Sequence, residues 1–189
     1  MKRLLLVLIL TFSFQSLTKA DDIRDFEIEG MSIGDSLLDY FTKDEIENNI
    51  THYKSKEFKT ANVKKVKEKY NFFRVSYKEG DQNYLIHGVS AIILYKKNID
   101  SCLKKIEEIT TEASTVFDNT KYNRSTWSPQ FDMKGTINSY EFKLGKGSLS
   151  IACLDYSVEM ENKKNKIDNL RISLMTKEYM DFLNNKAYK

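Results

Sequence analysis

The chain has 189 residues, and its formal net charge of +3 at pH 7 comes from residues 1–20, which carry three basic and no acidic side chains. Residues 21–189 hold 27 basic and 27 acidic side chains. This balance argues against nucleic-acid binding, which usually requires a strongly positive surface. The length suits one domain with a well-buried core.

Residues 1–20 have the pattern of a cleavable secretory signal peptide. A basic start precedes an apolar run at residues 4–14, and the small residues Thr18 and Ala20 suit cleavage after Ala20. The apolar run is too short to cross a bilayer, which needs about 20 residues. We therefore predict export to the periplasm, with no integral membrane segment after cleavage. An uncleaved N-terminal anchor is the alternative.

The next segment is acidic and predicts two short helices. Ser32 can cap a first helix that ends at Phe41, with Asp35 placed as a capping-box acid. Thr42 starts a second helix that runs to Ile50. Residues 21–50 hold 10 acidic and 2 basic side chains, whereas residues 51–78 hold 9 basic and 2 acidic side chains. We interpret these as neighbouring surfaces that balance each other; the alternative is a basic patch for an anionic partner.

Strand patterns follow, and then the longest helix. Residues 52–60 are a weak strand candidate, residues 70–78 are a clear strand, and residues 83–95 are a long strand with a central apolar run. In the clear strand the apolar face consists of Phe73, Val75 and Tyr77. Asn98 or Asp100 caps a long amphipathic helix that continues to Phe117.

The C-terminal half begins with a long connection at residues 118–135 and continues with three strands, at residues 136–144, 148–156 and 167–175. A charged loop at residues 158–166 precedes the third strand, and Thr176 caps a final helix. Hairpins with segregated helices indicate an α+β fold: an antiparallel sheet of about five to six strands with helices packed on one face. The order also allows two α-β-β-β units.

The two cysteines predict a disulfide. Cys102 lies on the apolar stripe of the long helix, and Cys153 lies on the apolar face of a strand. A helix that packs on that strand brings them together, and an oxidising compartment favours the bond. Two free, buried cysteines are the alternative. A redox site is not indicated, because no Cys-x-x-Cys motif is present.

The chain contains no motif for catalysis, metal binding or a cofactor. His52 and His87 have no metal-ligand spacing, and we interpret His87 as a strand histidine with a hydrogen-bond partner. The sequence at residues 145–148 lacks the spacing of a phosphate-binding loop and is a hairpin turn. Asp132 and Glu141 are a conceivable carboxylate pair, but nothing in the sequence sets their separation, so we assign them no role.

The long connection is the best candidate for an interaction surface. It carries residue types that are common in binding hot spots: Tyr122, Arg124, Trp127 and Phe131. Long connections in compact domains are often functional. The alternative is that Trp127 and Phe131 pack over the edge of the core.

Residues 28–41, IEGMSIGDSLLDYF, resemble the opening of a family of small secreted proteins of marine alphaproteobacteria. The segments at residues 168–172 and 176–178 resemble that family's ending, and the two cysteines are similarly placed. The resemblance covers most of residues 21–189 and implies a periplasmic location and a Gram-negative source, but no activity. The Gly-Met-Ser start at Gly30 is also similar to small envelope-assembly proteins, although their Leu-Gly-x-Pro helix exit is absent.

Together these features favour a non-enzymatic periplasmic module that binds an unknown protein or small-molecule ligand, and no nucleic acid. The alternatives are a hydrolase-type envelope enzyme, built on His87 or on acidic residues, and an envelope-assembly factor. A deep pocket lined by acidic side chains with shifted pKa values would favour the enzyme. An exposed aromatic patch or a free strand edge would favour the interaction module.

Overall fold

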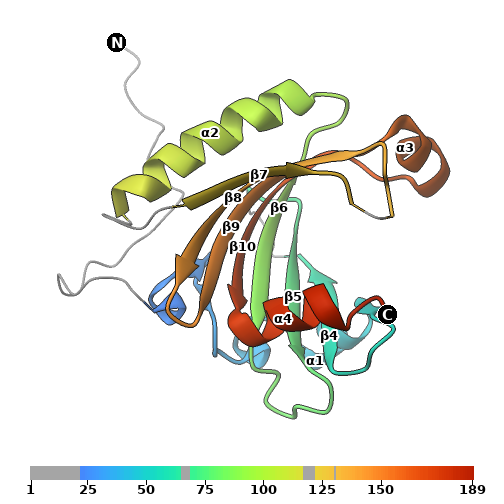
Figure 1. The fold of residues 1–189 in the computed structure, drawn as a ribbon. Helices are drawn as coiled ribbons and strands as arrows, with labels where there is room; N and C mark the ends of the chain where they lie inside the picture. Colours follow the sequence, from blue (N-terminus) through green and yellow to red (C-terminus); the bar gives the residue numbers. More distant parts are fainter. Residues whose placement is uncertain (1–21, 65–68, 117–121, 130) are drawn as a thin grey trace.

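The computed structural model describes residues 22–64, 69–116, 122–129 and 131–189 (Figure 1). The predicted signal peptide lies outside these ranges. The described residues form an eight-stranded antiparallel sheet with helices against it, so the predicted α+β class is confirmed. The predicted five to six strands were too few, because two short or exposed strands at the sheet edges carry weak sequence signals.

The N-terminal segment consists of short elements. It contains 3-10 helix η1 (Ile23–Asp25), β1 (Glu27–Ile28), β2 (Met31–Ser32), 3-10 helix η2 (Leu37–Asp39) and helix α1 (Lys43–Glu47). The predicted helix from Ser32 to Phe41 is wrong. Gly34 has a φ of +95°, which is not helical, and its backbone N–H donates to the carbonyl of Ile86 at 2.9 Å rather than within a helix. Helix α1 is confirmed with its capping box at Thr42, although it ends before Ile50.

The large sheet consists of two four-stranded meanders. The first contains β3 (Ile50–His52), β4 (Phe58–Val63), β5 (Phe72–Lys78) and β6 (Gly88–Leu94), and the second contains β7 (Tyr122–Trp127), β8 (Thr136–Leu144), β9 (Gly147–Asp155) and β10 (Asn169–Thr176). The strand order is β3-β4-β5-β6-β10-β9-β8-β7, so the two meanders meet through their last strands. Each half therefore supplies four strands, rather than the three of an α-β-β-β unit.

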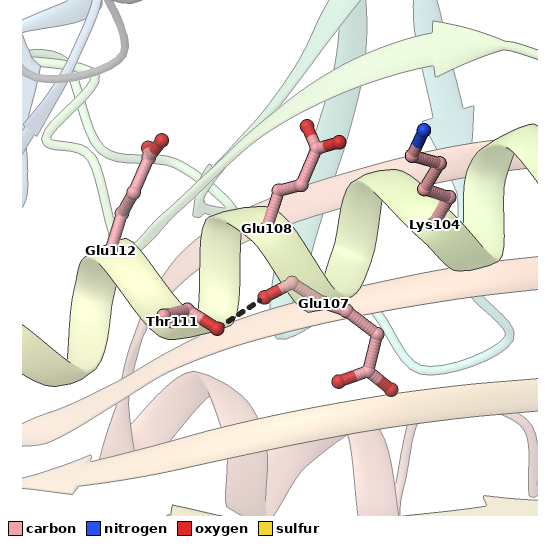
Figure 2. A pocket seen from close by; sticks show the side chains of 5 residues that line it. All are labelled: Lys104, Glu107, Glu108, Thr111 and Glu112. Carbon is pink, nitrogen blue, oxygen red and sulfur yellow. Dashed lines mark hydrogen bonds between the residues drawn. The ribbon is translucent and has the colours of Figure 1, made fainter.

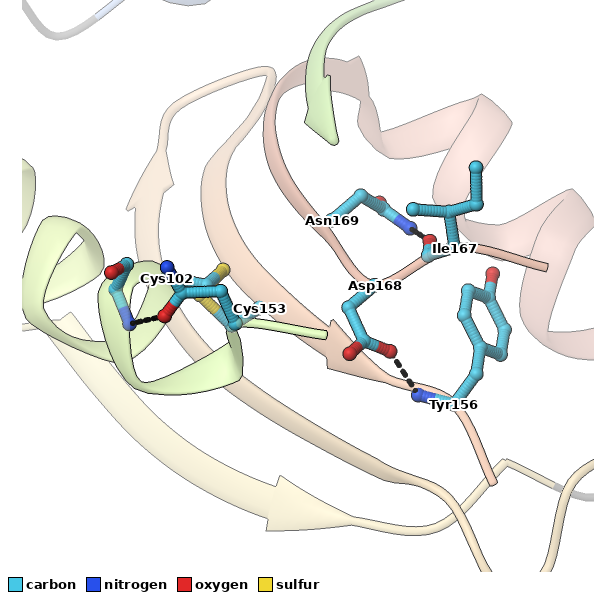
Figure 3. Close-up of a disulfide and its surroundings, with 8 residues drawn as sticks. Cys102, Cys153, Tyr156, Ile167, Asp168 and Asn169 are labelled. Carbon is cyan, nitrogen blue, oxygen red and sulfur yellow. Dashed lines mark hydrogen bonds between the residues drawn. A yellow bond between two sulfur atoms is a disulfide. The ribbon is translucent and has the colours of Figure 1, made fainter. Parts of the chain in front are cut away.

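One side of the sheet, here called the apolar face, carries Val75, Val89, Ile172 and Ile151. The predicted long helix, α2 (Ile99–Val116), and the N-terminal segment cover it. Burial of each large apolar side chain contributes roughly 1.5–3 kcal/mol. Cys102 of α2 and Cys153 of β9 form the predicted disulfide, with their Cα atoms 6.0 Å apart (Figure 3).

The opposite side, here called the polar face, is partly covered by the last helix, α4 (Lys177–Asn185). Phe58 of β4 packs there against Tyr179 and Phe182, with ring centroids 5.2 and 4.9 Å away. The Tyr179 hydroxyl also accepts a hydrogen bond from Ser76 at 2.8 Å. The prediction that helices pack on one face is therefore wrong, because α2 and α4 lie on opposite faces (Figure 1).

Two predicted loops contain regular structure. The connection at residues 118–135 contains β7, which is exposed along its whole length and therefore lacks the alternation of a half-buried strand. The charged loop at residues 158–166 is largely helix α3 (Val158–Lys164). Ser157 caps α3 by accepting a hydrogen bond from the backbone N–H of Met160 at 3.4 Å.

Candidate functional site

Strand β7 holds three of the four residues predicted as an interaction surface, Tyr122, Arg124 and Trp127. It is the last strand in the sheet order, and it pairs only with β8 among the described strands. All six of its residues are exposed. Its outer edge therefore presents backbone N–H and C=O groups that another strand can pair with.

Tyr122 and Arg124 lie together on the side of β7 that continues the apolar face. The Tyr122 ring contacts Tyr140 and Phe142, with centroids 5.4 and 5.3 Å away. The Arg124 guanidinium lies 5.4 Å from the Tyr140 ring centroid and 3.7 Å from the carboxylate of Glu107 on α2. These contacts restrict the two side chains, although both remain accessible to solvent.

Trp127 and Phe131 do not join this pair. Trp127 is opposite Ile137, on the side of β7 that continues the polar face, and it is 50% exposed. Phe131 lies beyond the strand and is 62% exposed. Neither ring packs into the core, in contrast to the alternative considered from the sequence. Three of the four predicted residues thus share one strand, with side chains on both of its sides, whereas Phe131 lies outside it.

The polar face contains a second cluster, which the sequence analysis missed. One row of facing residues, here called the polar row, crosses the sheet and consists of Asn62, Arg74, Ser90, Ser173, Ser150, Glu141 and Asn123. Ser90 and Ser173 are buried and share a hydrogen bond of 2.8 Å between their hydroxyls. The signal was available, because polar residues alternate with the apolar residues of β5, β6 and β10.

Arg171 of β10 lies in the next row of the polar face, between Ile92 and Ala152. Its side chain is half-buried, and its Nε atom is buried without a hydrogen-bond partner. Burial and, to a smaller extent, the positive charge of Arg74 lower the pKa of the Arg171 guanidinium to about 10. Arg74 donates from Nε to the side-chain oxygen of Asn62 at 3.2 Å.

His87 does not form a catalytic arrangement with the described residues. Its Nδ1 atom is 3.7 Å from the Glu178 carboxylate and has no hydrogen-bond partner, and its ring packs edge-on against Phe58 at 5.3 Å. Burial lowers the pKa of the imidazole, and Lys78 adds to this effect, whereas Glu178 and Asp81 oppose it. The predicted hydrogen-bond partner is absent among the described residues, and His87 lies just before β6 rather than within a strand.

Asp132 and Glu141 occupy different environments. Asp132 is buried and accepts hydrogen bonds from the backbone N–H groups of Gly135 at 3.1 Å and Ser157 at 2.9 Å. Burial alone would raise the pKa of Asp132, but these hydrogen bonds outweigh it and lower the pKa. Glu141 belongs to the polar row. Asp132 therefore ties the segment before β8 to the start of α3, which is a structural role.

A shallow depression runs along the outer side of α2 (Figure 2). Lys104, Glu107, Glu108, Thr111 and Glu112 line it, and all five come from one helix. The Thr111 hydroxyl donates to the carbonyl of Glu107 at 2.8 Å, and Lys105 pairs with Glu108 at 2.9 Å. This surface is an ordinary solvated helix face, not an enclosed site.

Among the described residues, no cluster of His, Cys, Asp or Glu side chains has the geometry of a metal site. Within the same ranges, no helix combines the length and the apolar composition required to cross a membrane. Comparison with protein-family models, curated proteins and solved structures finds no match to this chain.

Proposed function

We propose that the protein is a non-enzymatic interaction module of the bacterial periplasm that holds an extended segment of a partner protein along the free edge of β7. The observation that carries this proposal is the exposure of the strand: all six residues of β7 are exposed, at the end of an eight-stranded sheet. A peptide that adds to such an edge gains main-chain hydrogen bonds, and its side chains contact both faces of the sheet.

The side chains of β7 suit this mode of binding. Tyr122 and Arg124 are held against Tyr140 on one side of the strand, whereas Trp127 extends on the other side. An added strand projects its side chains alternately to the two sides of the sheet. The side chains on one side can therefore contact Tyr122, and those on the other side can contact Trp127. Tyr, Trp and Arg are the residue types that most often dominate binding energy.

The predicted export and the disulfide support a periplasmic location. Cys102 and Cys153 are bonded, and structural disulfides persist mainly in oxidising compartments such as the periplasm. The hydrolase alternative lacks comparable support, because no nucleophile among the described residues is hydrogen-bonded to His87.

A proline scan of β7 tests the proposal. Asn123, Arg124, Ser125 and Thr126 are each changed to proline, which removes one backbone N–H. Alternate residues of an edge strand point their N–H groups to β8 or to solvent. One alternate pair, either the variants at Asn123 and Ser125 or those at Arg124 and Thr126, should lose stability. The other pair should keep the melting temperature within a few degrees of the wild-type value. The stable pair should no longer capture the partner that cross-links to the wild-type protein in periplasmic extract.

Leu38→Ala is the matched control, because Leu38 is a 44% exposed apolar residue of η2, outside β7. It should retain partner capture. Trp127→Ala should weaken capture without unfolding the protein, since the side chain is half exposed. Capture that survives in both stable proline variants would exclude strand addition at β7.

A further inference from the structure

Arg171 and Arg74 are two positively charged side chains on the polar face of the sheet. Neither has a carboxylate partner among the described residues. None of the ion pairs of the described residues involves Arg171 or Arg74, although the exposed arginines Arg24 and Arg124 each have a carboxylate partner. Arg171 also makes no side-chain hydrogen bond in the described part of the chain, and its Nε atom is buried. The register places both residues on the same face with only β6 between their strands, because Arg74 pairs with Ser90 and Arg171 pairs with Ile92.

This arrangement costs stability in the absence of a ligand. A partly buried cation without a partner loses part of its hydration, and a like charge beside it adds repulsion. A buried N–H donor without an acceptor carries a further penalty. An external anion would reduce these penalties by supplying the missing negative charge and acceptor atoms. The partly exposed side chain of Arg171 leaves such a group a route to the guanidinium.

Hydroxyl groups surround the two arginines. Ser90 faces Arg74 across β5 and β6, and Ser173 follows Arg171 by two positions on the same face of β10. Tyr188, near the C-terminus, lies on the polar-face side, because its ring packs edge-on against Tyr53, whose hydroxyl is 2.8 Å from that of Thr60 on β4. Tyr188 is 69% exposed, so it sits at the rim of the cluster. Guanidinium groups flanked by hydroxyl donors match the acceptor geometry of an oxyanion.

We propose that Arg171 and Arg74 form a binding site for the oxyanion group of a small molecule, a carboxylate or a phosphate, on the polar face of the sheet. The oxyanion accepts hydrogen bonds from both guanidinium groups, in the case of Arg171 from the terminal nitrogen atoms, because its Nε atom is buried. The hydroxyls of Ser90, which accepts from Ser173, and of Tyr188 donate to its remaining oxygen atoms. This site is separate from the edge of β7, and it does not depend on the proposed partner binding.

Thermal unfolding of the whole exported protein tests the site. Sodium phosphate and sodium acetate, the two probes, are each compared with sodium chloride at the same ionic strength. A ligand at about ten times its Kd should raise the melting temperature by roughly 3–6 °C. We expect at least one probe to do so with the wild-type protein, and neither with Arg171→Met. If only phosphate raises the melting temperature, the site is a phosphate site. If only acetate raises it, the site is a carboxylate site.

The same variants report on the ligand-free state. Without either probe, Arg171→Met should melt at a temperature equal to or higher than that of the wild-type protein, because it removes an unpaired, partly buried charge. Arg74→Gln should also abolish the response to the probe, whereas Arg124→Gln, on the opposite side of the sheet, should retain it. An equal response of wild type and Arg171→Met, no response of the wild type, or a lower melting temperature for Arg171→Met would overturn the proposal.

Discussion

Gly88 lies directly beneath the ring of Tyr179. A Cβ atom at Gly88 would be 2.7 Å from Cε1 of Tyr179, closer than non-bonded carbon atoms approach. The missing side chain on β6 therefore provides the space in which α4 packs on the polar face. Tyr179 uses this position to place its hydroxyl 2.6 Å from Tyr53 and within hydrogen-bond distance of Ser76.

Gly88→Ala should therefore destabilise the protein by about 1–3 kcal/mol, because overpacking displaces the Tyr179 ring. Urea unfolding of the two proteins gives the difference in the free energy of unfolding. Tyr179→Ala removes the clash, so in that background Gly88→Ala should have little effect. If Gly88→Ala lowered the free energy of unfolding equally in the wild-type and the Tyr179→Ala proteins, the Tyr179 ring would not be the reason that glycine is required at this position.

His87 should make stability depend on pH near neutrality. Burial lowers the pKa of its imidazole in the folded state, so the unfolded chain, with a pKa near 6.5, binds the proton more readily. The contribution is fully present above about pH 6.5 and is lost as the pH falls toward the lowered folded-state pKa. The free energy of unfolding of the wild type, minus that of His87→Asn, should therefore decrease from pH 7.5 to pH 5.

His52→Asn is the matched control for this measurement, since His52 is exposed on β3. Its pH profile should follow the wild-type profile. If His87→Asn also kept the wild-type slope between pH 5 and 7.5, the imidazole of His87 would not be the group that titrates.

The apolar face of the sheet could be predicted where its strands alternate, as β5 does. Phe73, Val75 and Tyr77 face the core as predicted, and the placement of both cysteines on apolar stripes predicted their bond. The alternation of apolar and polar residues along a strand does not predict which element covers the polar face. The packing of α4 depends on Phe58 and on the space at Gly88, and neither is a periodic signal.

Tertiary contacts account for the failed prediction near the N-terminus. Ser32 and Asp35 match a capping box, and Asp35 does accept a hydrogen bond from the backbone N–H of Ser32 at 2.8 Å. However, the chain then pairs with the segment before β6, through a bridge between Ser36 and Leu85. Local capping signals do not reveal this competition. The missing partner of Arg171 is likewise a property of packing, which residue order alone does not reveal.

Substitutions of Asp132 test whether its buried carboxylate has the structural role described above. Asp132→Ala leaves the buried N–H groups of Gly135 and Ser157 without their acceptor, and each unsatisfied group costs about 1–3 kcal/mol. We expect a loss of roughly 2–4 kcal/mol in urea unfolding. Asp132→Asn should cost less, because the amide oxygen still accepts one bond. Asp39→Ala, at an exposed site in η2, should have almost no effect. Unchanged stability of Asp132→Ala would remove the structural role assigned to the carboxylate.

The disulfide should contribute several kcal/mol to the stability of the fold. It joins α2 to β9 across a sequence separation of 51 residues. In the loop-entropy model, a crosslink of this span stabilises the folded state by about 4 kcal/mol. The double variant Cys102→Ser, Cys153→Ser should therefore melt roughly 8–16 °C below the wild-type protein, at about 2–4 °C per kcal/mol for a chain of this size.

The effect should come from the bond rather than from the sulfur atoms. The wild-type protein unfolded in the presence of reductant should melt close to the double variant, and the reductant should not change the variant itself. Because β7 and the polar row lie outside the disulfide contact, partner capture and the response to phosphate or acetate should persist below the lowered melting temperature. A reduced wild-type protein that melts at the oxidised temperature would show that α2 is held to β9 by apolar packing alone, through contacts such as those of Ile106 and Ile151.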